Sequence, residues 1–311
     1  MAFHDYLTSE VAEDWLDGLL TRRDAIRRLV LLGLSASAAA TFLAACAREA
    51  GSSAGASAAP GSPAPASAAA GSASPAPSGA AGSAPPAGGE SITFAGPRGD
   101  ILGFLAPAST PKGAMLVIHE NRGLTDHIRS VASRLAGDGY TSLAVDLLSE
   151  EGGTDALGEG GVQAALGSAS PERLVADMKA GLDELERRAP GAKLGAIGFC
   201  FGGAMVWTLL DAGDPRLAAA VPFYGPTPAA PDFSGNTAAV LGVYAENDSR
   251  VNASRDTAEA ALQAAGLTHE IKTYPGVDHA FFNDTGGRYS PEQASAAYAD
   301  VLAWLERYLG T

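Results

Sequence analysis

Residues 198–203, with the sequence GFCFGG, constrain the fold of this chain more than any other stretch. An apolar run at 194–197 precedes them and a second apolar run at 204–210 follows. A reactive side chain flanked by glycines between two such runs is typical of a strand, a sharp turn and a helix, the arrangement called a nucleophile elbow. We therefore expect Cys200 to stand at the end of a strand, exposed to a substrate as a nucleophile.

The composition indicates an acidic protein with one or two folded domains. The chain has 311 residues, a formal net charge of −14 and 46% hydrophobic residues. Phosphate binding needs clustered Lys and Arg, so the acidic balance argues against a nucleic-acid partner. The two cysteines, Cys46 and Cys200, lie far apart in different surroundings, so we expect no disulfide framework.

Residues 1–46 have the pattern of an export signal. Arg22 and Arg23 precede an apolar stretch, and residues 21–27 resemble the twin-arginine translocation motif, with Ala25 in place of the usual bulky residue. Residues 29–45 carry no charge and are shorter than the ~20 residues that span a bilayer, which favours a signal segment over a permanent membrane helix. The preceding residues are long and acidic for the start of such a signal.

The apolar stretch ends in residues 43–46, with the sequence LAAC, which resembles the bacterial lipobox. That resemblance implies that Cys46 is acylated and becomes the first residue of the mature protein. The alternative is a buried cysteine in an uncleaved anchor helix. On the first interpretation the protein is exported and anchored by lipid to the bacterial cell envelope, at its periplasmic or extracytoplasmic face.

A tether follows the signal. Every residue from 50 to 89 is Ala, Gly, Ser or Pro, so the stretch has no large apolar group to bury and cannot offset its ordering entropy. Its mean reach would be roughly 30–40 Å. We therefore divide the chain into a signal segment at 1–46, a disordered tether at 47–91 and a folded domain at 92–311.

The folded domain alternates between strand-like and helix-like segments. We expect strands at 92–94, 101–105, 114–119, 141–145, 193–197, 217–223, 238–244 and 270–274. We expect helices at 126–138, 174–188, 204–210, 253–265 and 291–308. This alternation predicts an α/β fold with a mostly parallel central sheet and helices on both faces. In such sheets the chemistry lies at the carboxyl ends of the strands.

A cysteine nucleophile needs a base, and the base needs a group that orients it. Beyond Cys200, Asp248 follows a predicted strand and is our candidate for the orienting acid, with Glu246 as its rival. His279 lies in the loop after the next strand, whereas His269 lies at the start of that strand. Singly, each residue could be an inert core cysteine or a surface histidine, but nucleophile, acid and histidine in this order favour a triad.

The folded domain resembles the dienelactone hydrolase family, within the α/β-hydrolase superfamily, over residues 92–309. Four motifs carry the resemblance: HENRG at 119–123, GFCFGG at 198–203, END at 246–248 and HAFFND at 279–284. The resemblance implies an α/β-hydrolase fold and a catalytic triad of Cys200, Asp248 and His279. It also implies hydrolysis of small esters or lactones through a thioacyl-enzyme, with carboxymethylenebutenolidase as the named activity, and no cofactor. We expect the catalytic domain to act as a monomer.

Three further roles follow from the resemblance. Glu120 would contact the nucleophile and control its ionisation, the alternative being a solvated loop carboxylate. The backbone N–H groups of Asn121 and Phe201 would form the oxyanion hole, since one follows an early strand and the other follows the nucleophile. Arg122 would bind an anionic group of the substrate, or serve only the structure.

One position departs from the family pattern. Four residues after the catalytic histidine the family has an arginine that helps to hold a substrate carboxylate, and here Asn283 stands in its place. A carboxylate-bearing dienelactone is therefore in doubt as the physiological substrate, unless Arg288 or Arg122 compensates.

Two other functions are compatible with parts of the sequence. A lipid-anchored, non-catalytic binding module could keep the fold, although such a module has no need of a thiol on an elbow. A metal hydrolase could use His119, Glu120 and His127, but their spacing matches no metal signature.

Overall fold

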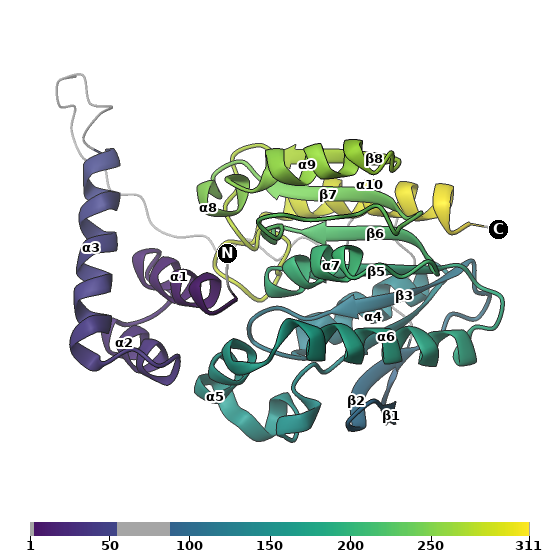
Figure 1. Ribbon diagram of the computed structural model, residues 1–311, viewed down its shortest axis with the longest axis horizontal. Helices are drawn as coiled ribbons and strands as arrows, with labels where there is room; N and C mark the ends of the chain where they lie inside the picture. Colours follow the sequence, from purple (N-terminus) through teal and green to yellow (C-terminus); the bar gives the residue numbers. More distant parts are fainter. Residues whose placement is uncertain (1–2, 55–87, 311) are drawn as a thin grey trace, which may run out of the picture.

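A central sheet of eight strands organises the protein (Figure 1). The computed structural model describes residues 3–54 and 88–310. The strands are β1 (Glu90–Gly96), β2 (Gly99–Ala106), β3 (Gly113–Ile118), β4 (Tyr140–Val145), β5 (Leu194–Phe199), β6 (Leu217–Phe223), β7 (Ala239–Ala245) and β8 (His269–Tyr274). β3, β4 and β5 are buried along their whole length, as expected of strands covered on both faces.

The strand order is β1-β2-β4-β3-β5-β6-β7-β8. β1 pairs antiparallel with β2, and β2 pairs antiparallel with β4, while every other neighbouring pair is parallel. The chain adds β4 on one side of β3 and then returns to add β5 on the other. This reversal of direction creates a crevice at the carboxyl ends of β3 and β5, where α/β sheets bind their ligands.

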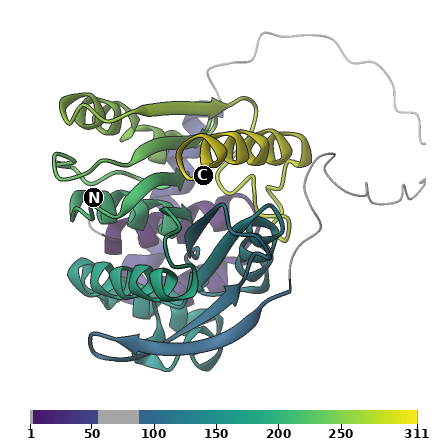
Figure 2. The ribbon, with the colours of Figure 1, turned by 90° about the vertical axis from the view of Figure 1, so that its right-hand side faces the viewer.

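Helices cover both faces of the sheet (Figure 2). α4 (Asp126–Gly137) and α10 (Pro291–Tyr308) pack on one face, and α6 (Pro171–Arg188) and α7 (Phe201–Asp211) pack on the other. The remaining helices of the domain are η1 (Ser149–Glu151), α5 (Thr154–Ser168), α8 (Ser249–Asn252) and α9 (Arg255–Ala264). The α/β-hydrolase fold expected from the sequence is confirmed, with every expected strand and helix present.

The sequence did not predict α5. Four of its fifteen residues are glycine, and Gly158 has φ of +64° and interrupts the helix with a kink. Because glycine is a poor helix former, local propensity does not indicate a helix here. The helix is held by tertiary contacts, with α1 and α2 packed against it.

Three helices precede the catalytic domain and pack together beside it: α1 (Phe3–Leu16), α2 (Arg22–Leu31) and α3 (Ala36–Ala54) (Figure 1). α3 continues past Cys46 to Ala54, and β1 begins at Glu90, so both ends of the stretch expected as a tether belong to regular elements. The central part of that stretch, residues 55–87, lies outside the described residues.

The apolar stretch expected as a signal is not one continuous helix. α2 ends at Leu31, and a turn that includes Gly33, with φ of +99°, separates it from α3. Among the described helices, none has both the length and the apolar character needed to cross a membrane.

Candidate active site

Cys200 occupies a sharp turn between β5 and α7. Its backbone has φ of +57° and ψ of −117°, a conformation that non-glycine residues rarely adopt. Its N–H donates a hydrogen bond to the carbonyl oxygen of Phe223, at the end of β6, over 3.1 Å. The thiol also stands at the N-terminus of α7, where the helix dipole favours a negative charge.

Glycines are required around this turn because backbones approach very closely. A Cβ at Gly203 would lie 2.2 Å from the Phe223 carbonyl oxygen, and a Cβ at Gly202 would lie 2.4 Å from that of Ile118. The start of α7 is therefore pressed against the ends of both β3 and β6. This contact brings the loop that carries Asn121 next to the nucleophile, and it explains the glycines of the GFCFGG motif.

His279 and Asp248 form a buried pair. The His279 Nδ1 lies 2.6 Å from the Asp248 Oδ2, and both residues are 4% exposed. The second carboxylate oxygen of Asp248 accepts a hydrogen bond from the Val251 N–H at 3.1 Å. Glu246, the rival, is exposed and accepts from the Gly276 N–H instead. Asp248 is thus the acid that contacts the histidine.

The nucleophile and the base are close to each other, and a carboxylate of α1 joins them. Three atoms lie within 4.8 Å of one another: the Cys200 Sγ, a ring nitrogen of His279 and a carboxylate oxygen of Glu10. The ring of Tyr224 packs against His279 with 5.1 Å between centroids. Backbone strain concentrates here, since the non-glycine residues with positive φ in the described ranges are Cys200, Tyr224 and Ala280.

Electrostatics in this arrangement favour the neutral form of the thiol and the charged form of the imidazole. Burial raises the pKa of the Cys200 thiol, and the Glu10 carboxylate raises it further, against the opposing effect of His279. Burial acts against the charged form of His279, but Glu10 and Asp248 outweigh it and raise the pKa of His279 well above its ordinary value. Burial also acts against ionisation of Asp248, but His279 outweighs it and lowers the pKa of that carboxyl.

Glu120 follows β3 and is buried, so it is not a solvated loop carboxylate, and in addition to burial and Glu10 its charge raises the pKa of the Cys200 thiol. Its Oε2 accepts a hydrogen bond from the Asn283 Nδ2 at 2.6 Å, and burial raises the pKa of the Glu120 carboxyl. The Asn283 Oδ1 in turn accepts from the N–H and the hydroxyl of Thr285, at 3.0 and 2.7 Å. The residue that replaces the family arginine therefore holds Glu120. A second carboxylate, that of Glu10, has its Oε2 3.8 Å from the Cys200 Sγ.

The other expected site residues take varied positions. Asn121 follows β3 and its side chain lies 3.5 Å from a Glu10 oxygen, while Phe201 is the first residue of α7. Arg122 is exposed and lines the cavity beside the nucleophile. Arg288 lines the same cavity, but its guanidinium pairs with Asp14 of α1 and with Asp17, just after that helix.

The histidines of the metal hypothesis have other partners. The His119 Nδ1 lies 2.7 Å from the Glu120 carbonyl oxygen, and its Nε2 accepts from the Leu147 N–H. The His127 Nδ1 lies 2.7 Å from an Asp284 carboxylate oxygen. Both ring nitrogens of His119 therefore have partners, whereas the buried His127 Nε2 has none among the described residues.

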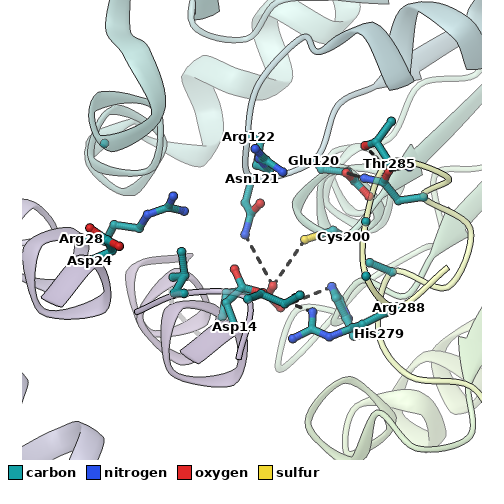
Figure 3. A pocket seen from close by; sticks show the side chains of 18 of the residues that line it. Asp14, Asp24, Arg28, Glu120, Asn121, Arg122, Cys200, His279, Thr285 and Arg288 are labelled. Carbon is teal, nitrogen blue, oxygen red and sulfur yellow. Dashed lines mark hydrogen bonds and ion pairs between the residues drawn. The ribbon is translucent and has the colours of Figure 1, made fainter. Parts of the chain in front are cut away.

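The site opens into a cavity of about 660 Å³ between the catalytic domain and the N-terminal helices. Figure 3 shows Cys200 and His279 on the domain side of this cavity, with Asp14 and Arg28 on the side of α1 and α2. A volume of this size suits a small organic substrate. Three residues that lie at this site, Tyr6, Glu10 and Arg250, were not among those predicted from the sequence.

Comparison with known proteins decides the family. The family model described as "Dienelactone hydrolase family" matches residues 102–309. The chain belongs to the dienelactone hydrolase family. A "Putative carboxymethylenebutenolidase" from Saccharolobus solfataricus is 30% identical over 248 residues, which cover 67% of this chain and 94% of that protein. As a member of this family the chain is a carboxylic ester hydrolase.

Solved structures give the same fold. The "Putative Dienelactone Hydrolase" from Klebsiella pneumoniae is 26% identical with a TM-score of 0.62, covering 71% of this chain and 98% of that one. A dienelactone hydrolase-like promiscuous phosphotriesterase from metagenomic libraries, 23% identical with a TM-score of 0.62, shares the fold over 73% of this chain and all of its own. The family model begins at residue 102, so the matched family domain lies in the part of the chain that follows α1–α3.

Proposed function

We propose that the catalytic domain hydrolyses small esters or lactones with Cys200 as nucleophile, His279 as general base and Asp248 as the group that orients the base. The observation that carries this proposal is the buried chain of contacts from Asp248 through His279 towards the thiol on a strained elbow. A pure binding module has no use for this combination of strain and buried charge.

The proposed reaction proceeds in two stages. His279 takes the proton of the Cys200 thiol, and the sulfur attacks the carbonyl carbon of the substrate. The backbone N–H groups of Asn121 and Phe201 stabilise the oxyanion, the ester C–O bond breaks, and the leaving oxygen takes the proton from His279. Water, activated by the same imidazole, then hydrolyses the thioester and releases a carboxylic acid. No cofactor is needed for these steps.

We propose a supporting role for Glu120 that depends on Asn283. A buried carboxylate held by an amide donor stays beside the site without forming an ion pair. Since Asn283 carries no charge and its donor group is engaged, it is poorly suited to bind a substrate carboxylate, and simple esters and lactones fit the site better than an anionic dienelactone. Arg122, at the rim of the cavity, is the proposed contact for any anionic group.

The test is hydrolysis by a chain that begins at residue 88, which retains the matched family domain. We expect turnover of p-nitrophenyl acetate and of simple lactones, with kcat/KM reduced at least 10³-fold in Cys200→Ala. A dienelactone in the same panel measures the carboxymethylenebutenolidase-like activity directly. Full activity of Cys200→Ala towards all these substrates would exclude the mechanism, and an inactive domain with an unreactive thiol would favour the binding module.

We also propose that the protein is exported and lipid-anchored through Cys46. Arg22 and Arg23 are exposed at the first turn of α2, where an export machinery could read them, and Cys46 follows the apolar stretch. Intact-mass analysis of the mature protein from its own membranes tests the proposal. We expect a diacylglycerol-modified Cys46 at the amino terminus, and an unlipidated mature form that begins elsewhere would contradict it.

A further inference from the structure

Helix α1 is docked in the active-site crevice by its side chains. One face of α1 is buried: at helical spacing it carries Tyr6, Leu7, Glu10 and Val11, each at most 2% exposed. The buried face includes a carboxylate, which is unusual for an acidic helix unless that carboxylate has a partner. The Tyr6 hydroxyl lies 3.2 Å from the Cys200 Sγ. With α1 in place, Cys200 is 3% exposed.

Two arginines of the catalytic domain hold this helix by charge. Arg250, in α8, pairs with Glu10 and with Glu13, and its guanidinium lies 4.6 Å from the centre of the Tyr6 ring. Arg288, in the loop before α10, pairs with Asp14 at 3.2 Å and with Asp17 at 2.6 Å. The contacting atoms are shielded, since the Arg250 and Arg288 side chains are 11% and 9% exposed. Of their partners only Glu10 is fully buried, at 2% exposure, so solvent screens the Glu10–Arg250 pair least.

The Glu10 carboxylate lies where the acid product of ester hydrolysis would lie. Its oxygens are 3.8 Å from the Cys200 Sγ, 3.4 Å from the His279 Nε2 and 3.5 Å from the Asn121 Nδ2. With a carboxylate at each ring nitrogen, His279 is held as an imidazolium and cannot accept the thiol proton. Glu10 therefore blocks the approach of a carbonyl and also disables the general base.

We propose that the active-site crevice is the docking site of this chain's own helix α1, which acts as an intramolecular inhibitor and keeps the precursor inactive. The inference rests on the proposed function of Cys200 and His279. Processing in front of Cys46 would remove α1 and α2 together with the part of α3 that precedes it. Such processing would expose Arg250 and Arg288 at the mouth of the crevice and free the base. The acidic character of the first twenty residues is explained by these two arginines.

The experiment compares forms of the full chain, purified without export, with the chain that begins at residue 88. The readouts are kcat/KM for p-nitrophenyl acetate and the rate of iodoacetamide reaction at Cys200, located by peptide mass mapping. We expect the full chain to be at least tenfold slower than the truncated chain in both. Tyr6→Ala and Glu10→Lys, which break different contacts of α1, should each recover a large part of that difference in the full chain.

The matched control is Asp5→Asn, which removes an acidic group from the same helix on its exposed side, where the side chain is 70% exposed. It should behave like the unmodified full chain. Equal activity and thiol reactivity in the full and truncated chains would overturn the inhibitory role and leave the proposed function intact. An inactive truncated chain would instead refute the proposed function. Recovery by Asp5→Asn equal to that by Glu10→Lys would show that the contacts at Cys200 are not the cause.

Discussion

Asp248→Asn in the chain that begins at residue 88 is the substitution whose effect is most closely defined by the structure. The carboxylate lies 2.6 Å from the His279 Nδ1, and both groups are 4% exposed, so water has little access to replace it. Asparagine has nearly the same shape and keeps an acceptor for the Val251 N–H, but it cannot carry the charge that stabilises an imidazolium.

The expected loss follows from that charge. Loss of the equivalent acid in a serine triad costs about 10⁴-fold in kcat, because the base adopts the wrong tautomer and its charged form loses its partner. At 1.36 kcal/mol for each factor of ten, this is about 5 kcal/mol of transition-state stabilisation. Because Asp248 also raises the pKa of His279, the acidic limb of the pH–rate profile should move to lower pH in Asp248→Asn.

The assay is initial-rate hydrolysis of p-nitrophenyl acetate across pH, with thermal unfolding to confirm that the variant is folded. Glu246→Gln is the control, since Glu246 is exposed and contacts only the backbone near the histidine loop, and its kcat should stay within about twofold. A folded Asp248→Asn enzyme that keeps more than a tenth of the activity would refute the reasoning. So would a Glu246→Gln enzyme that loses as much as Asp248→Asn.

Three further perturbations test neighbouring parts of the site. Gly203→Ala places a Cβ 2.2 Å from a backbone carbonyl oxygen of the next strand. We expect it to lower the free energy of unfolding in urea by about 1–3 kcal/mol, and an unchanged urea midpoint would contradict that packing. Asn283→Ala removes the amide group that donates a hydrogen bond to the Glu120 carboxylate. We expect the free energy of unfolding to fall by about 1–3 kcal/mol in the same measurement, and a fall below about 0.5 kcal/mol would show that this hydrogen bond contributes little. Glu10→Gln removes a charge that raises the pKa of Cys200, so in the full chain the pH midpoint of iodoacetamide alkylation should fall, whereas an unchanged or higher midpoint would contradict this.

The fold could be predicted from the sequence because its signals are local. Apolar runs define β3, β5 and β7, and the glycines of the GFCFGG motif are required by the close contact of α7 with its neighbouring strands. The order of Cys200, Asp248 and His279 along the chain also predicted which residues meet, although only the structure distinguishes Asp248 from Glu246 as the contact of the histidine.

The contacts of α1 with the site and the partner of Glu120 could not be predicted, because they join segments that are distant in the sequence. Glu10 and Arg250 are 240 residues apart, and no local pattern pairs them. Residues 6–14 carry apolar and acidic side chains at helical spacing, but this pattern does not identify the segment against which they pack. The partner of Glu120 was likewise visible only in space, since Asn283 lies 163 residues away.

The most direct test of the central claim is to trap the covalent intermediate. A chain that begins at residue 88 would be mixed with a slowly hydrolysed aryl ester, quenched with acid during turnover, digested and analysed by mass spectrometry. The account predicts an acyl group on the Cys200 peptide that decays at the rate of turnover and is absent in Cys200→Ala. Turnover with no acyl group on Cys200, or with the acyl group on another residue, would contradict it.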